Sequence, residues 1–222
     1  FDKLLDFAFA HGLNYIVTGH YARIERDENT GRYILKKGVD EGKDQSYVLY
    51  NLTQHQLAHT IFPLGAYSKT QIREMAEKQS FCNARKHDSQ DICFVPDGDY
   101  VGFMEQYTGK RYPSGDFIDE NGKKIGTHAG AVRYTIGQRR GLGLPMGDRV
   151  YVCAKDMEKN TVTVGPVESL FATRVIVRDM NWISVPGLTG EMRVKAKLRY
   201  RQKEQPAVAS PLDGGRILLT FD

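Results

Sequence analysis

Cysteine is scarce in this sequence of 222 residues, and its copies follow no paired pattern. Cys82, Cys93 and Cys153 are odd in number and contain no CxxC pair, and no stretch resembles a secretory signal. These features argue against a disulfide-rich extracellular scaffold and favour a reducing compartment. No apolar run approaches the length that crosses a bilayer. We therefore expect a cytoplasmic protein with no membrane partner.

Motifs of several enzyme classes are also missing. No GxxxxGK[ST] loop occurs, and the Gly-x-Gly at 141–143 lacks the third glycine of a dinucleotide fingerprint. No nucleophile elbow supports a Ser-His-Asp hydrolase. Cys82 and Cys93 lie too far apart for a zinc knuckle, and His55 and His59, four residues apart, have no recurring carboxylate nearby. We expect no bound metal in this segment.

The net charge of +4 is mild, so the placement of charge is more informative than its total. The length allows one large domain or two to three small ones. The sequence begins at Phe1 inside a helical pattern, without an initiator Met, and closes at Asp222 directly after the apolar run 217–221. Both ends look as though they cut through structure, and we expect a piece of a longer protein.

The first twenty residues predict an α/β unit. Apolar residues recur at helical spacing from Phe1 to Ala8, and Gly12 stands where a helix C-cap glycine belongs. Residues 15–18 predict a short buried strand that ends in a Gly-His pair at 19–20. Ligands of such sheets lie beyond the carboxyl ends of the strands, so this loop is a candidate site.

Turn and cap signals predict the elements that follow. Two capping boxes, Thr53-x-x-Gln56 and Ser68-x-x-Gln71, each open a short helix, the second ending near Gln79. A boundary is expected at 96–99. The other predicted elements are a hairpin of 22–26 with 33–37, a helix near 100–107, a turn at 119–122, a basic glycine-rich loop at 137–143, a hairpin of 149–154 with 161–164, and strands from 174 onward that suggest a small barrel or sandwich.

Six cations alternate with other residues near the C-terminus: Arg193, Lys195, Lys197, Arg199, Arg201 and Lys203. On a single strand, this spacing places all six on one face. Like charges there repel one another, and a polyanion would offset that cost. The stripe therefore predicts a polyanion-binding face, the alternative being a solvated face with acidic neighbours on adjacent strands. Tyr200 could stack on an unpaired base or belong to the core.

Cys93 stands in an unusual setting for a thiol. Polar and charged residues fill 85–91, and Ile92 and Phe94 flank the cysteine. Nearby cations favour the thiolate, which is the reactive form. A small core residue at the start of a strand is the other reading. The local sequence leaves both open.

Four separated segments, 18–22, 43–47, 88–94 and 134–143, together with 197–202, occur in the order and spacing of one family. They read Thr-Gly-His-Tyr-Ala, Lys-Asp-Gln-Ser-Tyr, Asp-Ser-Gln-Asp-Ile-Cys-Phe, Tyr-Thr-Ile-Gly-Gln-Arg-Arg-Gly-Leu-Gly and Lys-Leu-Arg-Tyr-Arg-Gln. The chain resembles the bacterial tRNA-specific 2-thiouridylases, which place sulfur on the wobble uridine of certain tRNAs. The resemblance covers essentially the whole chain.

The resemblance implies a tRNA-uridine 2-sulfurtransferase that works in two steps. ATP, with Mg²⁺, adenylates the O2 of uridine 34, and a cysteine persulfide then delivers sulfur to C2 as AMP departs. Cys93 is the implied persulfide carrier. Gly19 is the implied backbone contact to ATP, where the lack of a side chain lets the main chain approach. The implied partners are tRNA and an upstream persulfide sulfur donor protein.

The resemblance also implies tRNA contacts and a fold. The implied tRNA contacts are His20, Lys43, Asp44, Gln45, Arg199 and Tyr200. The implied fold is α/β plus β. It comprises the end of an adenine-nucleotide hydrolase-like (PP-loop) α/β domain at 1–98, a small central α+β domain at 99–172, and a truncated C-terminal β-barrel at 173–222 that contacts tRNA.

Two parts of the family pattern are absent from this sequence. They are the Ser-Gly-Gly-Val-Asp-Ser loop for ATP and the motif with a second cysteine and a catalytic aspartate, for which neither Cys82 nor Cys153 can substitute. We therefore expect the isolated segment to be inactive. Two rival interpretations remain: a non-catalytic RNA-binding module, and an adenylating ligase for a small molecule, against which the basic stripe argues.

Overall fold

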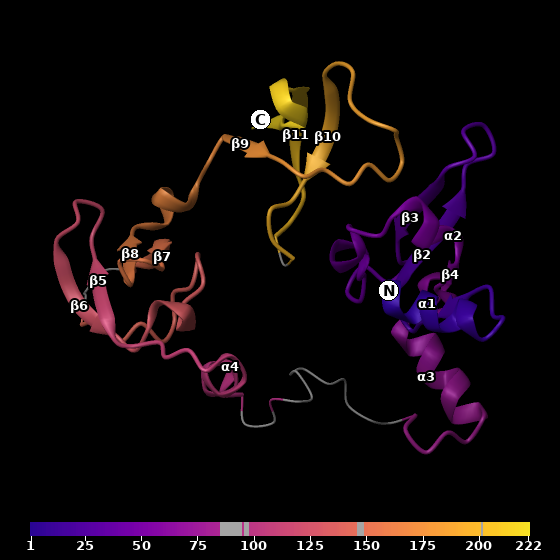
Figure 1. Ribbon diagram of the computed structural model, residues 1–222, viewed down its shortest axis with the longest axis horizontal. Coiled ribbons are helices and arrows are strands. Elements are labelled where there is room, and N and C mark those ends of the chain that lie inside the picture. Colours follow the sequence, from indigo (N-terminus) through magenta and orange to yellow (C-terminus); the bar gives the residue numbers. More distant parts are fainter. Residues whose placement is uncertain (85–94, 96–97, 146–148, 201) are drawn as a thin grey trace. The chain divides into compact units, whose positions relative to one another are not determined.

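The chain forms two compact units, shown in a computed structural model (Figure 1). Unit 1 combines Phe1–Lys86 with Thr173–Asp222, and unit 2 is His87–Ala172. The first and last of the three predicted domains thus contribute to one unit, and the boundaries at 98 and 172 stay predictions. The structure describes residues 1–84, 95, 98–145, 149–200 and 202–222.

The first helix of unit 1, α1 (Asp2–Ala10), ends as the sequence predicts. Gly12 has a φ of +72°, a conformation that favours glycine. Its N–H donates to the carbonyl of Phe9 at 3.0 Å, and the N–H of Leu13 donates to the carbonyl of Ala8 at 2.9 Å. This pair of bonds is a Schellman motif, which satisfies carbonyls that the helix leaves open.

The strand expected at 15–18 is present but is not buried. β1 (Ile16–Val17) pairs in parallel with β4 (Thr60–Ile61), and the side chains of Tyr15 and Val17 are 54% and 63% exposed. The two strands form a sheet of their own, as far as the described residues show, and two strands are too narrow to cover both faces. The prediction of a buried strand was therefore wrong.

The hairpin and both capping boxes are confirmed. β2 (Ala22–Arg26) pairs antiparallel with β3 (Tyr33–Lys37). In each box the cap hydroxyl accepts from the third backbone N–H at 3.2 Å, and the glutamine side chain accepts from the cap N–H at 2.8 Å. The boxes open α2 (Gln54–Ala58) and α3 (Lys69–Lys78). The 3₁₀ turns of this part are η1 (Ser46–Leu49) and η2 (Pro63–Ala66).

A small core lies between the hairpin and the helices after it. It consists of Ala22, Leu49, Leu52, Leu57 and Phe62. Gly65 makes this packing possible, because a Cβ there would lie 1.7 Å from the carbonyl oxygen of Ala22. Ile183, from the C-terminal part of unit 1, packs against the same core.

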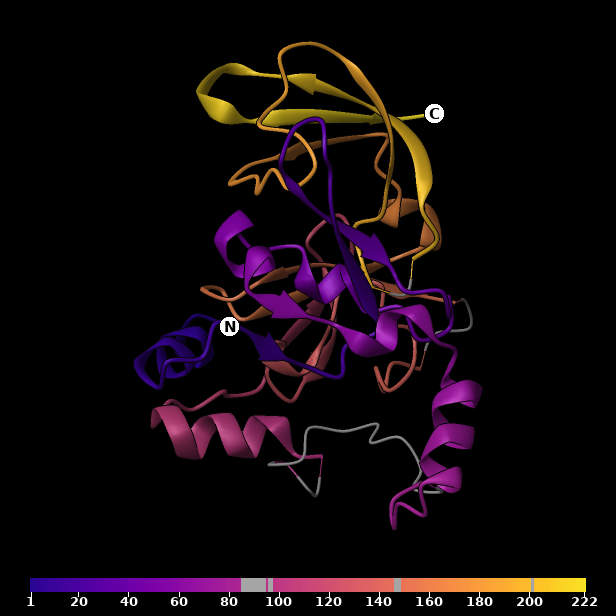
Figure 2. The ribbon, with the colours of Figure 1, turned by 90° about the vertical axis from the view of Figure 1, so that its right-hand side faces the viewer.

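The C-terminal part of unit 1 is an antiparallel sheet with the strand order β10-β11-β12-β9. Figure 2 shows β11 and β12 side by side in yellow. Among the described residues the sheet is open, so the structure does not confirm the expected barrel. Its elements are β9 (Arg174–Val177), β10 (Met192–Ala196), β11 (Gln205–Pro211), the 3₁₀ turn η5 (Asp213–Gly215) and β12 (Ile217–Phe221).

Hydrogen bonds to backbone carbonyls join the two parts of unit 1. The guanidinium of Arg32 donates to the carbonyls of Trp182 and Ile183 at 2.6 and 3.1 Å. The amide of Asn181 donates to the carbonyls of Tyr50 and Leu52, both at 2.9 Å. The segment before β10 is thereby held against the N-terminal part.

Unit 2 contains a four-stranded sheet with the order β6-β5-β8-β7, in which β5 and β8 run parallel. The predicted helix near 100–107, the turn at 119–122 and the second hairpin are confirmed. Phe117, Val152, Val162 and Val164 form most of its core. Its elements are α4 (Tyr100–Thr108), β5 (Gly115–Ile118), β6 (Lys124–His128), η3 (Ala131–Arg133), β7 (Tyr151–Asp156), β8 (Thr161–Gly165) and η4 (Val167–Leu170). Across the described ranges, no helix has the length and apolar character needed to span a membrane.

Candidate functional site

Asp44, a predicted tRNA contact, uses its carboxylate to shape its own loop. One carboxylate oxygen accepts from the N–H groups of Gly38 and Ser46 at 3.0 and 3.2 Å. The other accepts from the Ser46 hydroxyl at 2.8 Å. The side chain of Asp44 therefore holds the turn between β3 and η1, and its backbone carbonyl faces a different partner, described below.

Gln45 joins this loop to the segment after the Gly-His pair. Its side-chain oxygen accepts from the N–H of Tyr21 at 2.9 Å, and its own N–H donates to the carbonyl of Tyr21 at 2.9 Å. Segments 18–22 and 43–47, which the sequence analysis singled out separately, thus lie side by side. The polar groups of Gln45 are used for this junction.

His20 lies in a partly apolar setting. Its Nδ1 is 2.8 Å from the hydroxyl of Thr18, and its ring lies 5.9 Å from the ring of Phe1 and 5.7 Å from that of Phe62. Burial lowers the pKa of His20 below its ordinary value, so the imidazole is neutral at pH 7. His20 can offer a hydrogen bond or a stacking face to a ligand, but no positive charge.

Tyr200, one of the predicted tRNA contacts on the C-terminal side, meets the 43–47 loop. The hydroxyl of Tyr200 donates to the backbone carbonyl of Asp44 at 3.3 Å, across 156 residues of sequence. Tyr47 returns the contact, because its hydroxyl donates to the carbonyl of Leu198 at 3.1 Å. The rings of Tyr47 and Tyr200 lie 5.8 Å apart, and Lys197 lies over both. The structure thus brings Tyr200 next to the predicted loop.

The basic stripe does not form one strand face, so that prediction was wrong. β10 ends at Ala196, which faces Gln205, the first residue of β11. A turn follows, in which the N–H of Gln202 donates to the carbonyl of Arg199 at 3.1 Å. The side chains therefore stop alternating after Ala196. Arg193 lies in the strand, but its guanidinium makes two bonds to Asp222, at 2.8 and 2.7 Å.

The sequence analysis did not single out Tyr47, and it named Lys197 only as one of the six cations of the basic stripe. Both lie within motifs that it quoted, but neither has a spacing that reveals a partner 150 positions away. Their signal in the sequence was composition alone: an aromatic residue after Lys-Asp-Gln-Ser, and a lysine before Leu-Arg-Tyr.

The structure describes two of the three cysteines, Cys82 and Cys153. Cys93 lies outside the described residues, and its predicted role stays a prediction. Cys82 is exposed, and Cys153 is half-buried with its thiol donating to the carbonyl of Tyr151 at 3.2 Å. Burial raises the pKa of the Cys153 thiol, which disfavours the reactive thiolate. The described ranges contain no group of three or more His, Cys, Asp or Glu side chains that could hold a metal ion.

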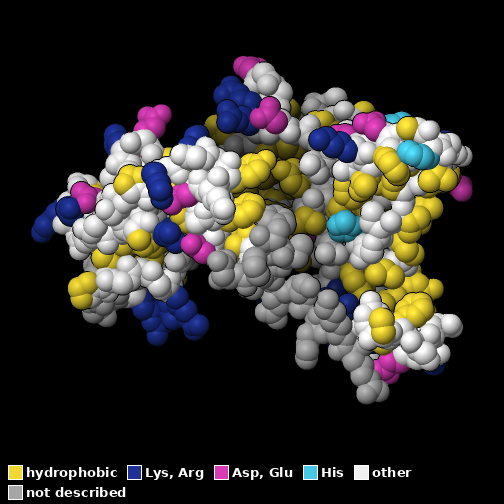
Figure 3. Space-filling model, turned by 60° about the horizontal axis from the view of Figure 1, so that its bottom comes forward, with side chains coloured by type: hydrophobic (Ala, Val, Ile, Leu, Met, Phe, Trp, Pro, Cys, Tyr) yellow, Lys and Arg dark blue, Asp and Glu magenta, His cyan; other side chains and the backbone are white. Residues whose placement is uncertain are grey.

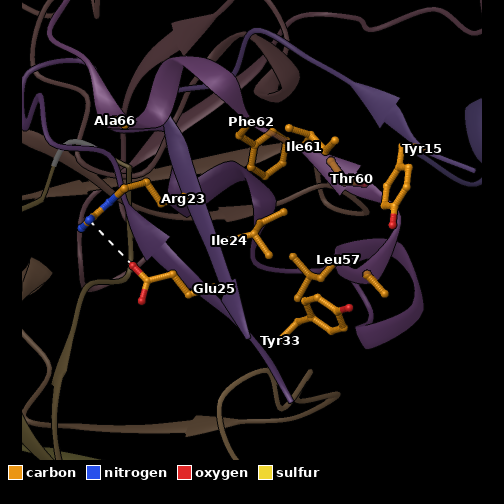
Figure 4. A pocket seen from close by; sticks show the side chains of 11 residues that line it. Tyr15, Arg23, Ile24, Glu25, Tyr33, Leu57, Thr60, Ile61, Phe62 and Ala66 are labelled. Carbon is orange, nitrogen blue, oxygen red and sulfur yellow. Dashed lines mark ion pairs between the residues drawn. The ribbon is translucent and has the colours of Figure 1, made fainter. Parts of the chain in front are cut away.

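A separate cavity of about 460 Å³ lies beside the hairpin of unit 1 (Figure 4). Its wall is mixed in polarity: Ile24, Leu57 and Phe62 point toward it, and an ion pair of Arg23 and Glu25 at 3.9 Å lies at its edge. None of the residues that the sequence predicted for the site lines this cavity. Figure 3 shows hydrophobic side chains and histidines on the surface of this part of the chain, which includes the exposed Leu4, Phe7, Leu13, Tyr15 and Val17.

Comparison with known proteins identifies the family. Two family models match: a tRNA methyl transferase HUP domain over residues 1–97 and a tRNA methyl transferase PRC-barrel domain over 101–166. Over its whole length of 222 residues, the chain is 48% identical to a tRNA-specific 2-thiouridylase MnmA of Heliobacterium modesticaldum. The chain belongs to the tRNA-specific 2-thiouridylase family. A tRNA-specific 2-thiouridylase MnmA 1 of Thermoanaerobacter sp. (strain X514) and a tRNA-specific 2-thiouridylase MnmA of Clostridioides difficile are 48% and 44% identical over the whole chain.

The chain spans about three fifths of these relatives. It covers 58% of the Heliobacterium protein, 61% of the Thermoanaerobacter protein and 62% of the Clostridioides protein. The family members therefore have sequence beyond the part that corresponds to residues 1–222. The match to the HUP and PRC-barrel models agrees with an α/β part followed by a β-rich part.

Proposed function

We propose that this chain acts, as part of a longer enzyme, in the ATP-dependent 2-thiolation of uridine 34 in tRNA. The observation that carries the proposal is the 48% identity, over the whole chain, to relatives named tRNA-specific 2-thiouridylases. The junction of segments 18–22, 43–47 and 197–200 in unit 1 supports it, because it gathers the predicted tRNA contacts on one part of the molecule. The reaction would take place in the cytoplasm.

The proposed chemistry divides between ATP and Cys93. ATP, with Mg²⁺, supplies an activated leaving group on O2 of the uridine. Cys93 would carry the sulfur as a persulfide received from an upstream donor protein, and the terminal sulfur would attack C2 as AMP leaves. The sulfur is then bonded to both C2 and Cys93. A second thiol, from the family motif that residues 1–222 lack, would attack the Cys93 sulfur and break the S–S bond, which frees the 2-thiouridine and leaves the two cysteines as a disulfide. The nearby cations Arg85 and Lys86 in the sequence favour an ionised sulfur at this position.

The predicted tRNA contacts have different roles in this proposal. Lys43 and Arg199 supply positive charge toward phosphates, and Tyr200 supplies an aromatic face. Asp44 and Gln45 act mainly by fixing the shape of the 43–47 loop, because the carboxylate of Asp44 bonds within the loop and the side chain of Gln45 bonds Tyr21. His20, neutral at pH 7, adds a hydrogen-bonding or stacking contact.

Gly19 fits a close backbone contact to ATP, with one limit. A Cβ at Gly19 would meet only Leu64, at 3.6 Å, so the packing of this chain leaves the position open. No glycine-rich phosphate loop is present in residues 1–222 to hold the triphosphate. The chain would thus contribute one wall of the ATP site.

A chimera tests the function directly. Residues 1–222 replace the matching region of the Heliobacterium relative, and nucleoside mass spectrometry measures 2-thiouridine formed from tRNA, ATP and a sulfur donor. We expect turnover by the chimera, loss of it with Cys93→Ser, and retention with Cys82→Ser and Cys153→Ser. Turnover that survives Cys93→Ser would sink the assignment of Cys93. No turnover by a folded, tRNA-binding chimera would favour a non-catalytic RNA-binding module.

The isolated chain provides a second test. We expect it to bind tRNA but to form no 2-thiouridine under the same conditions, and robust turnover would contradict this. Methyl transfer is the other reaction that the comparisons name, because both family models are described as tRNA methyl transferase domains. Incubation of the chimera with S-adenosylmethionine and tRNA should give no methylated nucleoside.

A further inference from the structure

Hydrogen bonds from two tyrosines connect two segments of unit 1 that are far apart in sequence. Tyr47, at the second position of η1, donates its hydroxyl to the carbonyl of Leu198 at 3.1 Å. Tyr200 donates its hydroxyl to the carbonyl of Asp44 at 3.3 Å. Each ring thus reaches across to the backbone of the other segment, and the two rings lie 5.8 Å apart.

Lys197 places a positive charge over both of these rings. Its ammonium nitrogen lies 5.1 Å from the ring centroid of Tyr47 and 6.0 Å from that of Tyr200. Within the described part of the chain, no carboxylate forms an ion pair with Lys197. The ring faces attract the charge but do not neutralise it.

This combination matches the surfaces that bind single-stranded RNA. Such surfaces pair cations with the phosphates and stack unpaired bases on aromatic rings. Tyr200 is 47% exposed, so part of its ring is open to a ligand. The hydroxyl bonds fix the rings before any ligand arrives, which lowers the entropic cost of binding.

We propose that Tyr47 and Lys197 form, with Tyr200, a binding site for one unpaired nucleotide of tRNA. The ammonium of Lys197 meets a phosphate, and a tyrosine ring carries the adjacent base. The two segments must be joined for the site to exist, so Tyr47 is also the residue that positions Tyr200. This inference rests on the proposed function, in which tRNA is the partner.

Removing the charge of Lys197 tests the phosphate contact. Lys197→Met keeps the length and apolar stem of the side chain. Binding of the 222-residue chain to a fluorescent tRNA is measured by anisotropy at several salt concentrations. We expect the Kd to rise about tenfold at low salt, and the slope of log K against log salt to become shallower by about 0.7. Lys110→Met, at an exposed lysine of unit 2, is the control and should change neither quantity.

Two variants of Tyr47 separate a binding role from a merely structural one. Tyr47→Phe loses only the bond to Leu198 and should raise the Kd about twofold to threefold, whereas Tyr47→Leu also loses the ring and should raise it about tenfold. Thermal unfolding of each variant verifies that it is folded. Equal effects of Phe and Leu would mean that Tyr47 only fastens the segments, and would overturn its role as a stacking face.

The outcomes distinguish this inference from the function beneath it. If the unsubstituted chain does not bind tRNA, both the proposed role in tRNA binding and this inference are overturned. If the unsubstituted chain binds tRNA and Lys197→Met binds with the same Kd and the same salt slope, only the inference is overturned.

Discussion

Different interactions stabilise the interior of each of the two units of this chain. Unit 2 has a continuous apolar core in which Phe117, Val152 and Val162 are fully buried. The two parts of unit 1 share an apolar contact, Ile183 on the small N-terminal core, and are joined mainly by hydrogen bonds from side chains such as Arg32 and Asn181 to backbone carbonyls. The candidate RNA-binding residues lie at this polar junction. Apolar burial stabilises without direction, whereas hydrogen bonds fix geometry, and a recognition surface needs the geometry.

The largest expected effect comes from emptying the core of unit 2. Phe117→Ala removes a fully buried ring and should lower the free energy of unfolding of unit 2 by about 3–5 kcal/mol. Far-UV circular dichroism in urea should show an earlier transition. The single tryptophan, Trp182, lies in unit 1, so its fluorescence transition should not move. An equal shift of both signals would contradict the separation of the units.

A smaller effect should follow from cutting the junction in unit 1. Arg32→Met removes two bonds from a charged donor to the carbonyls of Trp182 and Ile183. We expect a loss of about 1.5–3 kcal/mol, followed by the fluorescence of Trp182 in urea. Arg26→Met is the control, because the guanidinium of Arg26 donates within the exposed hairpin turn, to the carbonyl of Gly31 at 3.4 Å. Similar losses in the two variants would mean that the junction is not specially stabilising.

His128 should make unit 2 sensitive to acid. His128 is 2% exposed, its Nδ1 accepts from the N–H of Gly130 at 3.0 Å, and its Nε2 has no hydrogen-bond partner among the residues that the structure describes. Burial lowers the pKa of His128 below its ordinary 6.5, so the unfolded chain takes up a proton first as the pH falls. The free energy of unfolding of unit 2 is therefore unaffected by His128 at a pH above the ordinary histidine pKa. It declines as the pH falls below that value, by at most about 1.4 kcal/mol per pH unit.

The variant His128→Asn checks this assignment. The asparagine side-chain oxygen can accept the bond from Gly130, but it does not titrate. Urea unfolding of unit 2 between neutral and mildly acidic pH should show a weaker pH dependence in the variant than in the unsubstituted chain. An unchanged dependence would assign the acid sensitivity to other groups.

The smallest effect is expected at Arg193, and it concerns the basic stripe. Its pair with Asp222 is solvent-exposed, and exposed pairs contribute little to stability. Arg193→Met should leave both the unfolding transition and the Kd for tRNA essentially unchanged, whereas Lys197→Met weakens binding. Equal loss of affinity in the two variants would restore the interpretation of the stripe as one continuous binding face.

Local chemistry was predictable wherever the partners are close in sequence. Gly12 ends α1, the two Gln-containing capping boxes open α2 and α3, and the hairpin β2–β3 closes as expected. Each of these features depends on bonds that span five residues or fewer, or on a short turn. The four family motifs were equally readable, because a motif is a local pattern too.

The errors arose where a residue's setting depends on distant chain. Val17 was expected in a buried strand, but burial requires neighbouring strands, and only β4 pairs with β1 in the described residues. Lys197 was expected on a strand face, but β10 ends where its partner β11 begins. Neither the exposure of Val17 nor the end of β10 is visible in the local sequence pattern.

The amino-acid sequence alone determined the family, the helices with their caps, the hairpins, and Cys93 as the candidate sulfur carrier. Only the tertiary structure decided that the carboxylate of Asp44 bonds within its own loop and that the side chain of Gln45 bonds Tyr21. It also decided that Tyr47, Lys197 and Tyr200 meet. The physical reason is the separation along the sequence over which each interaction acts. Periodicity and capping act over a few residues, whereas this cluster is made by hydrogen bonds across 151 and 156 residues, which only the folded chain brings within 3.3 Å.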